Sequence, residues 1–339
     1  MVLLPTLSAF SQSTESILPG PKPAEAPPEW KKLVGIYRDE GSKQSYVMFE
    51  QNGKLFWRNE DGVSREGLIN DDTVFPPFEV NGKGLMLGRD MIPDDAGNIT
   101  ALCYLNFCYR RTDPGSDPSH PYRAKPTHPI ADLRREALAA TPPSEKGPFR
   151  QPDLVELAPL DPAIHLDIRY ATSNDFLGTP VYAQARAFLQ RPAAEALLRV
   201  LRKLKPLGYG LLIHDAYRPW YVTKIFWDAT PPEGKIFVAD PAQGSRHNRG
   251  CAVDLTLYDL KTGKPVEMPG TYDEMSPRSY PNYPGGTSLQ RWNRDLLRRA
   301  MESEGFTVYD YEWWHFDYKD WREYPILNIP FENLNVHPN

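Results

Sequence analysis

The chain has 339 residues, enough for two domains or for one domain with a long extension. Hydrophobic residues make up 40% of it and charged residues 24%, which is ordinary for a soluble globular protein. The formal net charge of −5 provides no basic surface for phosphates, so we do not expect nucleic acid as a partner. No apolar stretch is long enough to suggest a membrane span.

The N-terminal sequence MVLLPTLSAFSQS combines a short apolar run with a small-x-small pattern at residues 9–11. This pattern resembles the end of a secretory signal, although a basic segment before the apolar run is missing. We therefore expect a periplasmic or secreted protein, with a cytoplasmic location as the alternative. Residues 1–28 are interpreted as a remnant signal and a flexible lead-in, because residues 12–28 are rich in Ser, Pro and Glu.

Residues 29–112 consist of short apolar runs separated by turn residues, which predicts a small antiparallel β-domain of about six to eight strands. The pairs Asn52-Gly53 and Asn81-Gly82 each predict a β-hairpin. The later run NITALCYLNFCYRR is expected to form one long alternating strand. This domain has no cluster of His, Cys or acidic residues, so binding or structural support is its expected role.

The chain has three cysteines, too few for a disulfide framework. On a single strand, Cys103 and Cys108 would point to opposite faces. We therefore expect free thiols at both positions. Cys251 belongs to a second, apolar strand and is also expected to be a free, buried thiol.

The second half of the chain differs from the β-domain in mixing helices with strands. Residues 113–152 predict a Pro-rich linker that contains one helix, PIADLRREALAA, and residues 153–339 form the second domain. Apolar residues at helical spacing predict helices at RPAAEALLRVLRKLKPLG and SLQRWNRDLLRRAMESEG. YGLLIHDAYRP and FTVYDYEWWHF are each expected to contain one strand. Because helices and strands are segregated, the predicted class is α+β rather than doubly wound α/β.

The segment SRHNRGCAVD has a histidine before a glycine turn and an aspartate on the strand that follows. On this strand Asp254 lies on the face opposite to an apolar one. Gly250 permits a turn that would bring His247 back over the face of Asp254. A metal cation would explain this arrangement, because it would neutralise the carboxylate and bind an imidazole nitrogen. The alternative is an ordinary hydrogen bond between His247 and Asp254.

The segment YEWWHF supplies a second histidine and a second carboxylate. Glu312 and His315 are three residues apart, a spacing that converges on a helical turn but diverges on a regular strand. We therefore expect a turn or bulge if both residues serve one site. His315 would complete a His-Asp-His zinc set, and Glu312 would stay off the metal as a general base. Both tryptophans between them are interpreted as packing residues.

These two segments fit the patterns Ser-x-His-x-x-Gly-x-Ala-x-Asp and Glu-x-x-His, and so the chain resembles the zinc-dependent D-Ala-D-Ala dipeptidase family. RYATSNDFLGTPVY, DAYRP and GTYDEMSPRSY resemble that family in the same order. The resemblance covers residues 155–325 and leaves the N-terminal β-domain outside. It implies a catalytic domain with the fold of these peptidases, one zinc ion per chain, and hydrolysis of D-alanyl-D-alanine or a similar short dipeptide.

Residue by residue, the resemblance implies that His247, Asp254 and His315 bind zinc. It also implies that Glu312 is the general base and that Arg218 stabilises the oxyanion of the tetrahedral intermediate. A guanidinium suits this role because it is a fixed, permanently charged donor.

Three further residues fall at positions that the resemblance associates with holding the dipeptide, namely Tyr170, Ser245 and Asp273. Asp273 would bind the free ammonium group of the substrate. Each has a purely structural alternative: Tyr170 as a packing residue, Ser245 as a turn cap, and Asp273 as an acid on a surface turn.

Two other functions compete with the dipeptidase. A D,D-carboxypeptidase or peptidoglycan endopeptidase would use the same metal centre in a more open cleft, but it must accept an acylated amine, which Asp273 disfavours. A non-catalytic cell-wall-binding protein would use the β-domain for binding and the zinc fold as a scaffold. A scaffold needs neither Glu312 nor Arg218, so their presence favours an enzyme.

Overall fold

The computed structural model describes residues 17–39, 41–59, 63–64, 67–68, 89–95, 99–104, 107–112, 123–274 and 276–334. The chain divides into two compact units. The C-terminal unit contains Met1–Leu18, Pro121–Val266 and Leu296–Asn339, and the N-terminal unit contains Pro19–His120 and Glu267–Asp295. The N-terminal unit therefore includes a segment from the second half of the chain.

Within the described residues of the N-terminal unit, six strands form an antiparallel sheet in the order β3-β2-β1-β8-β7-β6. The sheet strands are β1 (Gly35–Asp39), β2 (Ser45–Gln51), β3 (Lys54–Asn59), β6 (Arg89–Pro93), β7 (Ile99–Tyr104) and β8 (Phe107–Arg111). A short helix precedes them, α2 (Pro28–Lys31), and β4 (Val63–Ser64) pairs separately with β5 (Gly67–Leu68). The predicted small antiparallel sheet is confirmed.

The turn between β2 and β3 illustrates how the local sequence directs the chain. Gln51 pairs with Lys54, so Asn52 and Gly53 form a two-residue loop. Both loop residues have positive φ, 52° and 73°, as a type I′ hairpin turn requires. This hairpin is confirmed, whereas the one predicted at residues 81–82 lies outside the described part of the chain.

The two cysteines of the sheet form a disulfide, and the prediction of free thiols was wrong. Residues 98–111 do not form one strand, because β7 ends at Tyr104 and β8 runs back beside it. Cys103 and Cys108 are therefore directly opposite each other, with their Cα atoms 4.2 Å apart, and are bonded. Cys251, in the C-terminal unit, is a free and buried thiol as expected.

In the C-terminal unit a mixed sheet has the described strands in the order β10-β12-β13-β15-β14. Its strands are β10 (Ile164–Leu166), β12 (Tyr209–Asp215), β13 (Ala252–Asp259), β14 (Phe306–Tyr309) and β15 (Glu312–Tyr318), and β9 (Leu154–Glu156) pairs with β11 (Phe188–Gln190). Only the pairing of β10 with β12 is parallel among these described pairs. This mixture of helix and sheet is consistent with an α+β peptidase domain.

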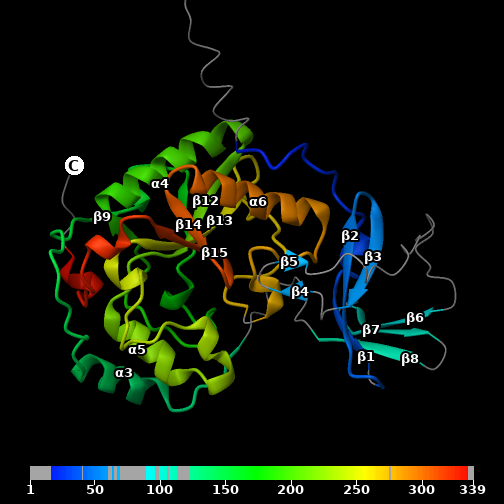
Figure 1. Ribbon diagram of the computed structural model, residues 1–339, viewed down its shortest axis with the longest axis horizontal. Helices are drawn as coiled ribbons and strands as arrows, with labels where there is room; N and C mark the ends of the chain where they lie inside the picture. The colour runs from blue at the N-terminus through cyan, green and yellow to red at the C-terminus, as the bar shows by residue number, and fades with distance from the viewer. Residues whose placement is uncertain are drawn as a thin grey trace, which may run out of the picture. The chain divides into compact units, whose positions relative to one another are not determined.

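The described helices of eight or more residues are α3 (Ile130–Ala139), α4 (Arg191–Leu204), α5 (Trp220–Ala229) and α6 (Ser288–Glu302). In the view of Figure 1, α4 lies above the sheet of the C-terminal unit and α3 and α5 lie below it. Of the apolar residues that helical spacing predicted for the buried face of α4, Leu197, Leu201 and Leu204 are buried, whereas Leu198 is half-buried. Across the described part of the chain, no helix has the length and apolar character needed to cross a membrane.

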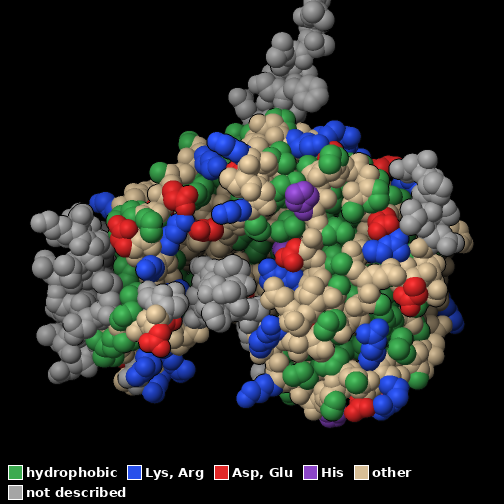
Figure 2. Space-filling model, turned by 180° about the vertical axis from the view of Figure 1, so that it is seen from behind, with side chains coloured by type: hydrophobic (Ala, Val, Ile, Leu, Met, Phe, Trp, Pro, Cys, Tyr) green, Lys and Arg blue, Asp and Glu red, His purple; other side chains and the backbone are tan. Residues whose placement is uncertain are grey.

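The aromatic run FTVYDYEWWHF departs from its predicted single strand. It forms a hairpin in which β14 and β15 pair antiparallel on either side of residues 310–311. Aromatic residues stand on both sides of Asp310 and no Gly or Pro marks the turn, which is why the sequence alone did not indicate a break. Over the face drawn in Figure 2, basic and acidic side chains of the described residues are interspersed.

The disulfide can be checked by counting thiols. Under denaturing, non-reducing conditions we expect one modified cysteine, Cys251, and after reduction we expect all three. Replacing Cys103 and Cys108 together by Ala should lower the free energy of unfolding by about 2 kcal/mol, because a short loop closed by a disulfide restricts the unfolded chain. Three modified cysteines before reduction would contradict the assignment.

Candidate metal centre

The turn before β13 brings the side chains of His247 and Asp254 together at one site. Residues His247–Arg249 form a short 3-10 helix, which ends at Gly250 in the left-handed conformation with φ of 67°. The chain then enters β13, where Val253 and Leu255 are completely buried on the apolar face. Asp254 lies on the opposite face, as the alternation of the sequence predicted.

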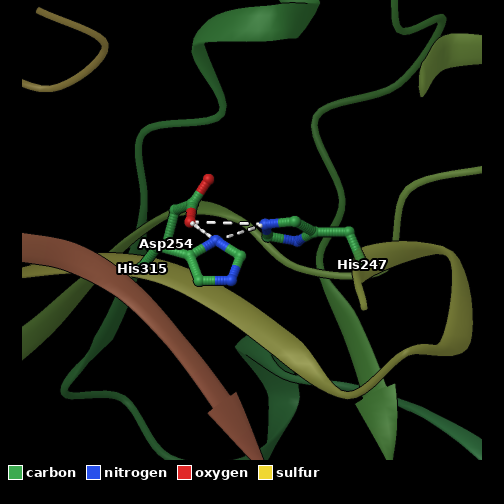
Figure 3. Close-up of side chains that lie close together, drawn as sticks. All are labelled: His247, Asp254 and His315. Carbon is green, nitrogen blue, oxygen red and sulfur yellow. Dashed lines mark hydrogen bonds and ion pairs between the residues drawn. The ribbon is translucent and has the colours of Figure 1, made fainter. Parts of the chain in front are cut away.

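Two imidazole nitrogens and one carboxylate oxygen meet in this place (Figure 3). Oδ1 of Asp254 lies 3.3 Å from Nε2 of His247 and 3.0 Å from Nδ1 of His315, and the two nitrogens are themselves 3.0 Å apart. All three residues are buried, with 2%, 2% and 7% of the surface of His247, Asp254 and His315 exposed. Nitrogen and oxygen donors converging in a buried space fit a divalent metal ion.

The second nitrogen of each imidazole is held by another part of the protein. Nδ1 of His247 lies 2.6 Å from the backbone oxygen of Ala216, and Nε2 of His315 lies 2.9 Å from Oδ1 of Asp317. Such contacts orient metal-binding histidines and select the nitrogen that is presented to the ion. Asp317 was not among the residues predicted from the sequence, although its position two residues after His315 on a strand places both side chains on one face.

A bulge in the β14–β15 hairpin brings Glu312 to the same site. Val308 is opposite Phe316, but the next residue, Tyr309, is opposite Glu312, so β15 contains extra residues at this point. Oε2 of Glu312 consequently lies 3.7 Å from Nδ1 of His315. The expected turn or bulge is confirmed.

The electrostatics of the centre follow from its burial. Burial raises the pKa of Glu312 to about 7, with Asp254 adding to the rise while His315 and Arg218 oppose it. Burial alone would also raise the pKa of Asp254, but His247 and His315 outweigh it and hold the pKa well below its ordinary value. Burial lowers the pKa of His315, whereas Asp317 and Asp254 together raise it to about 10.

Arg218 lies at the edge of the centre and is held rigidly. Its Nη2 and Nε atoms lie 2.8 Å and 2.9 Å from Oδ2 of Asp215, and Nη2 is 3.9 Å from Oδ2 of Asp254. The guanidinium also lies over the rings of Tyr170 and Phe226, 5.4 Å and 4.8 Å from their centroids.

Asp215 is a second residue of the site that was not predicted from the sequence. Its Oδ1 accepts hydrogen bonds from the hydroxyl of Tyr182 at 2.7 Å and the backbone N–H of Ala216 at 2.9 Å. One oxygen of Asp215 therefore holds Arg218 in place, and the other is hydrogen-bonded to Tyr182 and to the backbone of Ala216. The only signal in the sequence was its position in DAYRP, at the end of a strand.

The three predicted substrate residues have different surroundings. Tyr170 is 2% exposed and packs under Arg218. Oγ of Ser245 accepts the backbone N–H of His247 at 3.2 Å, which is the turn-capping contact anticipated as its structural alternative. Asp273 belongs to the N-terminal unit, in the segment Glu267–Asp295, and has a left-handed φ of 58°.

Comparison with known proteins identifies relatives of the part of the chain that carries the candidate metal centre. The family model described as D-ala-D-ala dipeptidase matches residues 150–336. A D-alanyl-D-alanine dipeptidase of Escherichia coli is 36% identical over 179 residues, which cover 53% of this chain and 91% of the relative. Those of Enterococcus faecalis and Streptomyces coelicolor are 36% and 34% identical, covering 51% and 46% of this chain and 95% and 87% of the relatives. The N-terminal β-strands lie outside the matched region.

Replacing Gly250 by Ala tests the turn that presents His247. A Cβ atom there would lie 2.5 Å from Cδ2 of Leu154, and the φ of 67° disfavours any side chain. We expect the free energy of unfolding to fall by about 2–3 kcal/mol, from backbone strain together with overpacking.

Gly263→Ala is the matched control, because Gly263 has a φ of 72° but no atom within 4 Å of the place that a Cβ would occupy. It should cost only about 1 kcal/mol, the strain alone. Urea unfolding of both variants measures the difference, and equal losses would show that the contact with Leu154 is unimportant.

Proposed function

The chain belongs to the D-ala-D-ala dipeptidase family, and we propose that it is a zinc metallopeptidase that hydrolyses D-alanyl-D-alanine or similar short dipeptides. We also propose that its C-terminal unit has the fold of the zinc peptidases of this family. The observation that carries the proposal is the buried convergence of His247, Asp254 and His315, with Glu312 and Arg218 beside it.

The donor set suits zinc. Catalytic zinc sites use three protein ligands, in hydrolytic enzymes commonly nitrogen and oxygen donors, and keep one position open. His247, Asp254 and His315 provide such a set, and the second nitrogens of both histidines already have hydrogen-bonding partners. These residues would hold a zinc ion, which would supply Lewis-acid chemistry, namely a lower pKa for water and polarisation of the scissile carbonyl.

Glu312 is proposed as the general base. It is close enough to the ligands to receive a proton from the attacking water, and it can then deliver that proton to the leaving amine. Oε2 of Glu312 lies 3.7 Å from Nδ1 of His315, which places the carboxylate beside the proposed ligands, where a general base has to act.

Arg218 is proposed to stabilise the negative charge that develops on the carbonyl oxygen. Its guanidinium is permanently charged, and its contacts with Asp215 and two aromatic rings hold it before the reaction begins. Preorganised donors of this kind stabilise a transition state without a reorganisation cost. Tyr170, Ser245 and Asp273 remain the proposed contacts of the dipeptide, with Asp273 binding its ammonium group.

We further propose that the protein acts in the periplasm or after secretion, where it would meet dipeptides released from the cell wall. The disulfide between Cys103 and Cys108 supports this location, because disulfides persist mainly in oxidising compartments. Cell fractionation with an antibody against the chain is the test, and recovery in the cytoplasm alone would contradict it.

The function is tested with two substrates, free D-Ala-D-Ala and the same dipeptide with its amine acetylated. We expect the zinc-loaded protein to release amine from the free dipeptide only, because Asp273 needs a substrate ammonium. Cleavage of the acetylated dipeptide would instead indicate a D,D-carboxypeptidase or endopeptidase. Inactivity on both, with zinc bound, would favour a non-catalytic cell-wall-binding protein.

Glu312→Gln separates catalysis from metal binding. We expect kcat/KM for D-Ala-D-Ala to fall about 10²–10⁴-fold, the usual contribution of a general base, while the zinc content stays unchanged. Glu302→Gln is the matched control, since Glu302 is exposed on α6 and pairs only with Arg298 in the contacts described for its carboxylate. Full activity of Glu312→Gln would remove Glu312 from the mechanism.

A further inference from the structure

We propose that Asp317 is a positioning residue of the metal centre. Its carboxylate accepts a hydrogen bond from Nε2–H of His315 and so holds the ring with Nδ1 directed at Asp254 and His247. The inference rests on the proposed metal site and adds to it a residue that acts through a ligand rather than on the ion.

The backbone register fixes the geometry of this contact. Asp254 is directly opposite His315 across β13 and β15, and Ala252 is directly opposite Asp317. His315 and Asp317 therefore occupy the same face of β15, and the small side chain of Ala252 leaves room for the carboxylate. Oδ1 of Asp317 lies 2.9 Å from Nε2 of His315, and 14% of the Asp317 side chain is exposed.

Asp317 contacts the side of the ring that faces away from the other ligands. Nδ1 of His315 is the atom within 3.0 Å of Asp254 and of His247, whereas Nε2 is the atom bound to Asp317. One imidazole nitrogen cannot serve the ion and donate to a carboxylate at once. In the neutral imidazole that a metal ion requires, the contact therefore selects the tautomer with a proton on Nε2 and a free electron pair on Nδ1.

A cation accompanies the carboxylate. Nε of Arg246 lies 3.4 Å from Oδ2 of Asp317, and its guanidinium lies over Trp321 and Tyr309, 5.0 Å and 5.8 Å from the ring centroids. A carboxylate acceptor makes His315 a stronger ligand than a neutral acceptor would.

The two histidines of the centre differ in the group that accepts a hydrogen bond from the second ring nitrogen. His247 donates to the backbone oxygen of Ala216, a neutral acceptor that no substitution removes. His315 depends on a side chain, so its orientation can be altered without touching any ligand. Loss of such a carboxylate partner typically weakens metal binding about 10–100-fold.

The experiment compares Asp317→Asn and Asp317→Ala with the wild-type chain at full length. The Kd for Zn²⁺ is measured by competition with a chromophoric chelator, and the visible spectrum of the Co²⁺-loaded protein reports the ligand geometry. We expect the Kd to rise about 10-fold for Asn, which keeps the shape and an acceptor, and about 100-fold for Ala. The Co²⁺ spectrum should change for Ala.

Asp320→Asn is the matched control on the same segment, because Asp320 contacts the exposed Lys319. Its Kd should equal that of the wild type. Denaturant unfolding of each metal-free variant separates a structural role from positioning: a stability loss with an unchanged Kd and Co²⁺ spectrum would overturn the inference. If the Ala variant does not fold, the isosteric Asn variant decides the matter.

His247→Ala distinguishes failure of this inference from failure of the proposed function. If the wild type binds Zn²⁺ and His247→Ala does not, the metal site stands. Asp317 variants with a Kd within twofold of the wild type would then overturn the role of Asp317 alone. A wild-type protein that binds no Zn²⁺ would overturn both.

Discussion

The antiparallel pairing of β13 with β15 is the constraint on which the metal centre depends. It places Asp254 directly opposite His315, so that two ligand atoms 3.0 Å apart come from neighbouring backbones joined by hydrogen bonds. His247 reaches the same point from the preceding turn because Gly250 takes a left-handed conformation. A shift of one residue in this register would turn Asp254 and His315 to opposite faces of the sheet.

The distribution of charge around the centre is consistent with a bound cation. Asp215 and Asp254 are buried and Glu312 and Asp317 are half-buried around the centre, and the cations described nearby are Arg218 and Arg246. Buried carboxylates are costly unless they are paired or coordinate a metal. A divalent ion at the three ligands would supply positive charge at the point where two imidazoles and a carboxylate meet, and it would change the ionisation of every group around it.

The N-terminal unit also contains Glu267–Asp295, a segment that lies within the region matched by the dipeptidase family model. Its sheet packs Ile36, Val47 and Phe49 against Tyr283, which comes from the second half of the chain. The backbone N–H of Glu50 bonds to the oxygen of Gly286, and its carboxylate accepts the N–H of Ser288. The segment Glu267–Asp295, which carries Asp273, is therefore stabilised by the core of the β-strands.

The α4 helix, the hairpin at Asn52-Gly53 and the candidates His247, Asp254, Glu312 and His315 were all predictable from the sequence, because side-chain periodicity, turn residues and motif spacing are local. Asp215 and Asp317, the partners of Arg218 and His315, were not predicted, nor was the bond between Cys103 and Cys108. Local patterns state which face of a strand a residue occupies, but not where the strand ends or which residue lies opposite. Those features depend on register, bulges and packing between distant segments, so they are fixed only when the chain has folded.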